Sequence, residues 1–148
     1  DLVRSRGLGD VYKRQVLEGL ASRHAAEKNA ALAAKQGPAL LEAGRKAVAS
    51  GAVAKMIAAD IRFHEFLYTL SGNELIAPAL ATHLTYTQRM MGEVLIRDAK
   101  PRDIWNQHAD ILDAVVRGDG ASAEALTRSH IQQAASFMVG RLRDAAAS

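Results

Sequence analysis

The sequence predicts an all-α domain, an antiparallel bundle of helices, and three observations indicate this fold class. Hydrophobic residues fill 49% of the 148 positions but aromatic residues only 5%, which is typical of helices packed closely side by side. Apolar residues recur every three or four positions, the period of an α-helix, and few stretches alternate as strands do. Short groups of glycine, proline and polar residues separate these periodic stretches.

The first three helices are expected between residue 16 and the turn at Ser71-Gly72-Asn73. The stretch "VLEGLASRHAAEKNAALAAK", residues 16–35, has one apolar side, and Gly37-Pro38 should end the helix. A second helix over 38–50 should close at Ser50-Gly51, and a third is expected over 52–70.

The last three helices are expected over residues 74–96, 103–117 and 121–145. Ser71-Gly72-Asn73 provides a glycine to end one helix and an asparagine to cap the next. The polar link "RDAKPRD" precedes the fifth helix, and Gly118-Asp119-Gly120 separates the fifth from the sixth. Short links of this kind join antiparallel neighbours in a bundle.

The first fifteen residues differ in character from the rest of the chain. They hold four basic and two acidic residues, so without them 19 basic against 16 acidic becomes 15 against 14. An excess of basic over acidic residues would favour a nucleic-acid partner. Most of this excess comes from the first fifteen residues. "SRGLGDVYKRQ", residues 5–15, resembles the in-frame translation of a transposase-based sequencing adaptor. We expect residues 1–15 to be adaptor read-through, and the biological sequence to begin near Val16 with an N-terminal part missing.

Composition also limits the class of protein. The chain has no cysteine, so it can form neither disulfides nor thiolate metal sites. No apolar run approaches the roughly 20 residues that span a bilayer. A soluble cytoplasmic helical protein is the expectation.

Four polar residues occupy positions that helical periodicity assigns to the core. Asp60 and His64 are one turn apart on the third helix, so they share a face. His108 and His130 fall at core positions of the fifth and sixth helices. A buried carboxylate is costly unless it is paired or coordinated. One carboxylate and three imidazoles suit a divalent transition metal such as zinc, nickel, manganese or iron.

Spacing alone leaves a second interpretation open. A single histidine on an apolar face is usually a core residue with its own hydrogen bonds, and Asp60 with His64 could be a simple bonded pair. His24 and His83 also lie near apolar stripes, and we interpret both as structural.

The motifs around these residues resemble a known domain. "DIRFHEFLYTLSGNELI" and "WNQHADILDAVVRGDGASAEALTRSHI" resemble the FCD domain, the C-terminal effector-binding domain of FadR-type regulators in the GntR family of transcription factors. "VLEGLASRHAAEKNA" is similar to the first helix of that domain, with Glu18 at its acidic position. The likeness covers about residues 16–145. The positions that fit the family pattern are Asp60, Phe63, His64, Leu67, Gly72, Asn73, His108, Ile111, Ala114, Gly118, Asp119 and His130.

The resemblance implies a bundle of six to seven helices with a central cavity, where Asp60, His64, His108 and His130 hold a metal ion. It also implies a small organic acid as effector, whose carboxylate reaches the metal. Arg89 matches a position where many relatives carry an arginine, which could bind a second carboxylate or a hydroxyl of the acid. The other interpretation of Arg89 is a solvated surface arginine. FCD regulators are commonly homodimers that bind DNA through a winged helix-turn-helix domain. That domain is absent from residues 16–148, so this polypeptide should bind effector but not operator.

Three functions follow, and the first is preferred. In the first, which the resemblance implies, the chain is expected to be a metal-dependent effector-sensing domain of a bacterial transcription regulator. It is not expected to be an enzyme, because no nucleophile–base pair indicates catalysis. The alternative is a mononuclear metalloenzyme built on the same residues; a di-metal version would need Glu-x-x-His pairs, which the sequence lacks. The third is a purely structural helical domain.

Overall fold

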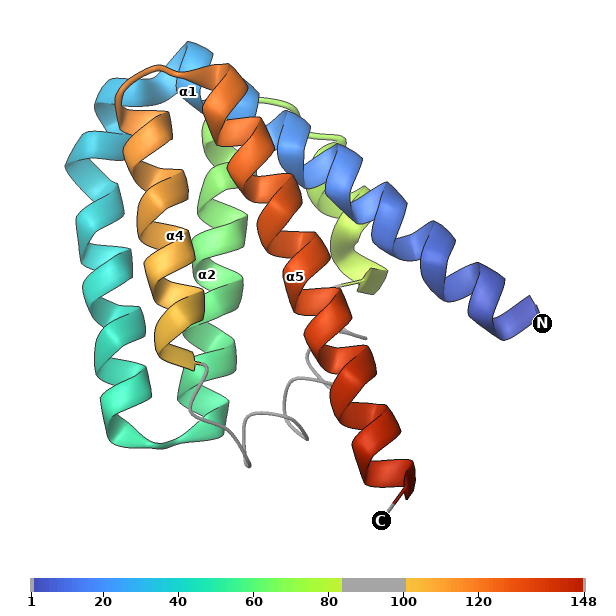
Figure 1. Cartoon of the computed structure of the whole chain (residues 1–148). Helices are drawn as coiled ribbons and strands as arrows, with labels where there is room; N and C mark the ends of the chain where they lie inside the picture. Colours follow the sequence, from blue (N-terminus) through green and yellow to red (C-terminus); the bar gives the residue numbers. More distant parts are fainter. Residues whose placement is uncertain (1, 84–100, 148) are drawn as a thin grey trace.

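The computed structural model describes residues 2–83 and 101–147, and every regular element among them is a helix (Figure 1). Residues 76–83 form a helical segment. The longer helices are α1 (Leu2–Ser50), α2 (Val53–Ser71), α4 (Pro101–Val116) and α5 (Gly120–Ala147). The all-α prediction is confirmed for these residues. The count of six to seven helices stays a prediction, and most of the expected helix over 74–96 lies outside the described residues.

Helix α1 holds the bundle together because it contacts α2, α4 and α5. Figure 1 shows its second half running beside α2 and α4, while its first half crosses toward α5. In the first half, Arg23 Nε donates to Glu124 on α5, and Thr127 Oγ1 donates to Ser22 Oγ over 2.7 Å. The two halves of one long helix thus line different sides of the interior.

The break between these halves lies at Asn29, so the prediction that Gly37-Pro38 ends the first helix was wrong. Asn29 has φ −139° and ψ 36°, which are not helical, whereas Pro38 lies inside α1. The Asn29 side chain donates from Nδ2 to the carbonyl oxygen of Leu70 over 2.7 Å. This bond satisfies one of the carbonyls left free at the end of α2. The kink is therefore tied to the neighbouring helix.

Glycines 37 and 44 have a packing role instead. They lie seven residues apart, so they fall on nearly the same face of α1. A Cβ at Gly37 would overlap the Leu112 side chain, and one at Gly44 would overlap the indole of Trp105. The missing side chains let α4 approach α1 closely, so these glycines serve helix packing and Gly37 does not end a helix.

The predicted turns at the other glycines are confirmed. Gly51, Gly72 and Gly118 have φ values of 70°, 71° and 71°, a left-handed conformation that glycine adopts without strain. Asn73 Oδ1 accepts the backbone N–H of Leu75, as a helix cap does, and Asp119 Oδ1 does the same for Ser122. The turns at Gly51 and Gly118 join α1 to α2 and α4 to α5, and the turn at Gly72 ends α2.

The core lies mainly between the second half of α1, α2 and α4. Its largest members are Met56, Phe63, Leu67, Leu70, Trp105, Ile111, Leu112 and Val115. A smaller cluster joins Ala21 and Tyr68 to the segment 76–83. Several ionisable side chains are buried beside these clusters. Within residues 2–83 and 101–147, none of the helices has the length and apolar character to cross a bilayer.

Candidate metal centre

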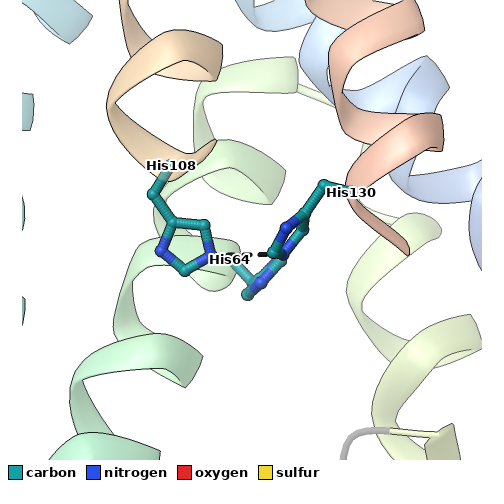
Figure 2. A group of neighbouring side chains, drawn as sticks. All are labelled: His64, His108 and His130. Carbon is teal, nitrogen blue, oxygen red and sulfur yellow. Dashed lines mark hydrogen bonds between the residues drawn. The ribbon is translucent and has the colours of Figure 1, made fainter. Parts of the chain in front are cut away.

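Four side chains from three helices meet inside the bundle. Helix α2 provides Asp60 and His64, α4 provides His108, and α5 provides His130. Only 6%, 2%, 0% and 5% of their respective surfaces are exposed. Figure 2 shows the three imidazoles turned toward one another. The structure therefore brings together all four residues that the helical phase had assigned to the interior.

The nitrogen and oxygen atoms of these side chains lie close together at the centre of the bundle. His108 Nε2 lies 3.3 Å from His130 Nε2 and 3.2 Å from Asp60 Oδ1. His64 Nε2 lies 3.6 Å from the same Asp60 oxygen. One ligand atom from each histidine lies within 4.8 Å of those of the other two. This geometry allows the three histidines to hold a metal ion, with Asp60 Oδ1 beside them.

One atom at the centre is buried without a hydrogen bond. His64 Nε2 has no hydrogen-bond partner among the described residues, because its 3.6 Å separation from Asp60 is too long. A buried polar nitrogen in a folded protein normally has a partner. A metal ion among the three rings would supply one, which is the structural sign that the donor set fits a cation.

The ring of His108 is fixed by packing. It stacks on Phe63 with a centroid separation of 4.4 Å and an interplanar angle of 15°, and it meets Trp105 edge-on at 4.6 Å. Its Nδ1 atom is buried and has no hydrogen-bond partner within the described part of the chain. Aromatic side chains from α2 and α4 thus hold His108 with Nε2 facing Asp60 and His130.

Glu18 on α1 is a site residue that the sequence did not predict. Its side chain is 1% exposed, and Oε1 lies 2.8 Å from His64 Nδ1. The same oxygen accepts the Tyr68 hydroxyl, and Oε2 accepts Arg14 Nε. The available signal was an acidic residue on the same face as the buried Ala21 and Ala25. Its partner lies 46 positions away, however, and no local pattern indicates that pairing.

Gln107 on α4 is the second site residue that was not predicted from the sequence. Its Oε1 atom contacts His130 Nδ1, on the side of the ring away from His108. Its Nε2 atom donates to Gln133 Oε1 over 3.0 Å. A glutamine at a partly exposed helix position carries no sequence signal for such a role.

Charges around the cluster set its protonation in the absence of a metal. Burial would lower the pKa of His64, but Glu18 and Asp60 together outweigh it and raise that pKa to about 10. Burial would raise the pKa of Asp60, yet attraction to His64 holds it well below its usual range. Burial lowers the pKa of His108, and it lowers that of His130 to about 4. His64 is therefore a charged imidazolium between two carboxylates, beside the two neutral rings of His108 and His130.

The other residues considered from sequence lie away from this cluster. Arg89 falls among residues 84–100, outside the described part of the structure. His24 and His83 are partly buried, and neither belongs to the group of three histidines.

Helices packed around a buried set of three imidazoles and a carboxylate define an all-α domain with a candidate metal or ligand site. Comparison with protein families matches residues 11–133 to the FCD domain. The chain therefore belongs to the FCD domain family, as the motifs predicted. FCD domains are the regulatory, effector-binding domains of GntR-family regulators and are not enzymes. Comparison with curated proteins finds no match.

Proposed function

We propose that this chain is the metal-dependent effector-sensing domain of a bacterial FadR-type transcription regulator, and that its effector is a small organic acid. One observation carries the proposal: Asp60, His64, His108 and His130 are buried together. His108 Nε2 lies 3.2 Å from Asp60 and 3.3 Å from His130, His64 Nε2 lies 3.6 Å from Asp60, and the three histidines offer ligand atoms within 4.8 Å of one another. Family membership supports the sensing role, because FCD domains bind small-molecule effectors.

The donor set supports a transition metal. Metal–nitrogen bonds of about 2.0–2.1 Å place two ligand atoms of one ion about 3.0–3.4 Å apart. The separations of 3.2 Å and 3.3 Å fall in this range, and 3.6 Å is slightly above it. Imidazole and carboxylate donors suit zinc, nickel, manganese or iron. Asp60, His64, His108 and His130 would hold the ion, which supplies a fixed positive charge in a buried site.

A carboxylate is the effector group that such a site favours. A divalent ion that faces three neutral imidazoles and one carboxylate keeps a net positive charge. Four protein ligands leave one or two positions for an anion on a five- or six-coordinate metal. Arg89 is proposed as a second contact, whose forked guanidinium would bind another carboxylate or hydroxyl of the acid.

In the parent protein, effector binding would be passed to a DNA-binding domain. The effector would favour one arrangement of the helices around the metal and so change the placement of two DNA-binding domains in a cytoplasmic homodimer.

Residues 1–15 remain proposed as adaptor read-through. The family match begins at residue 11, and Arg14 pairs with the buried Glu18.

The experiment combines metal analysis with thermal unfolding in the presence of small carboxylic acids. The purified chain should contain close to one metal ion, and a chelator should lower its melting temperature. Carboxylic acids should raise the melting temperature of the loaded protein and leave that of the chelated protein unchanged. His64→Ala should remove both responses.

His24→Ala is the matched control, because His24 is partly buried on α1 and lies outside the histidine group. It should retain both the chelator response and the acid response. A chelator effect of equal size in wild type and His64→Ala would contradict the metal assignment. An acid that stabilises the chelated protein as strongly as the loaded protein would contradict the proposed recognition of carboxylate by the metal.

A further inference from the structure

Two hydrogen-bond acceptors, Glu18 and Gln107, lie behind the rings of His64 and His130, on the sides away from the centre of the cluster. Glu18 is a buried carboxylate on the far side of the His64 ring from the cluster, because it contacts Nδ1 while Nε2 faces Asp60. Two further donors, Tyr68 and Arg14, hold its oxygens. The carboxylate can only accept at this position, so the proton on His64 Nδ1 is fixed. The remaining nitrogen, Nε2, is then the one available to a metal.

Gln107 acts on His130 in the same way through a neutral group. Gln107 Nε2 donates to Gln133 Oε1 over 3.0 Å, and Gln133 Nε2 donates to Ser129 Oγ over 2.9 Å. This chain of donors leaves the Gln107 oxygen as an acceptor for His130 Nδ1. His130 Nε2 is therefore left with its lone pair toward His108 and the centre of the cluster.

We propose that Glu18 and Gln107 are positioning residues of the metal centre, each of which fixes the tautomer and ring orientation of one histidine ligand. The inference rests on the metal site of the proposed function and adds two residues to it. Histidines that bind metals usually donate their other ring N–H to such an acceptor, and loss of the acceptor typically weakens metal binding 10–100-fold. His108 differs because Phe63 and Trp105 orient its ring by packing.

Glu18 offers a matched pair of variants that separates the acceptor from the charge. Glu18→Gln and Glu18→Leu both remove the negative charge, but only glutamine keeps an oxygen that can accept from His64 Nδ1. Zinc affinity of the full chain, measured by competition with a coloured chelator, should be 10–100-fold weaker in Glu18→Leu than in Glu18→Gln. Gln107→Leu, which changes no charge, should bind zinc 10–100-fold more weakly than wild type.

Two control variants remove polar groups from the same helices at a distance from the metal. Ser22→Ala, one turn beyond Glu18 on α1, loses the bond with Thr127. Asn106→Ala, next to Gln107 on α4, loses an exposed contact with Arg45. Both should keep the wild-type zinc affinity within about twofold.

A second readout is the nitrogen NMR of the histidines in the zinc-loaded protein, which should show protonated Nδ1 and metal-bound Nε2 for His64 and His130.

The outcomes separate this inference from the proposed function. A wild-type chain that binds no metal overturns the proposed function itself. The positioning role alone is overturned if the wild-type chain binds zinc, Gln107→Leu binds it as tightly as wild type, and Glu18→Leu binds it as tightly as Glu18→Gln. A spectrum with Nδ1 of His64 or His130 bound to zinc would also overturn it. If Glu18→Leu does not fold, Gln107→Leu and the spectrum decide, because Gln107 is only partly buried.

Discussion

Loading the protein with a divalent metal at pH 7.5 should release about one proton for each chain. The proton comes from His64, whose pKa is raised to about 10 by Glu18 and Asp60 against the opposing effect of burial. A metal must displace it, because imidazole binds metals through a free lone pair. His108 and His130 should contribute almost nothing, since their pKa values are lowered.

The magnitude follows from these values. At pH 7.5 a group with a pKa of about 10 is almost fully protonated, so its release is close to one proton. Three histidines with the ordinary pKa of about 6.5 would together release only about 0.3 of a proton. The same displacement should make the apparent metal affinity rise about tenfold for each pH unit between about pH 5 and pH 9.

Isothermal titration of zinc into the chelator-treated protein, in several buffers with different ionisation enthalpies, measures the proton release. Glu18→Gln is the control, because it removes one of the two carboxylates that raise the His64 pKa while keeping the side-chain shape. Its proton release should fall below that of wild type, and any proton from metal-bound water cancels in the comparison. A wild-type release near 0.3, or an equal release in both proteins, would refute the charge arrangement described above.

Two further predictions concern stability. The chelated protein should lose stability as pH falls from about 6.5 to about 4, because folding keeps His108 and His130 neutral while the unfolded chain binds protons there. Urea unfolding at pH 7 and pH 5 measures this loss. Equal free energies of unfolding at the two pH values would contradict it. Gly44→Ala should destabilise the protein by about 1–3 kcal/mol, because its Cβ overlaps Trp105. Gly140→Ala, a helical control with open space around it, should be neutral or stabilising by up to about 1 kcal/mol, and equal melting temperatures for the two variants would disprove the packing argument.

Local spacing was enough to predict the part of the site that lies on single helices. Asp60 and His64 share a face because they are four residues apart in an uninterrupted helix. The core phase of His108 and His130 could be predicted in the same way, since each lies among apolar residues three or four positions away. Periodicity alone could not establish that the three faces meet, and the family motifs supplied that expectation.

Long-range contacts account for what the sequence did not predict. Asn29, at the kink of α1, bonds to Leu70, 41 positions away, and Gly37 lies where a Cβ would overlap Leu112 of α4. Glu18 is at the site only because the first half of α1 crosses α2 at His64. Each of these features follows from how helices distant in sequence pack, which the residues around it do not encode.

Metal K-edge X-ray absorption of the zinc-loaded full chain tests the central claim most directly. The account predicts one ion for each chain, bound by three imidazole nitrogens at about 2.0–2.1 Å and a carboxylate oxygen. Zinc that is bound by fewer than two imidazoles, or that is not retained at all, would contradict it.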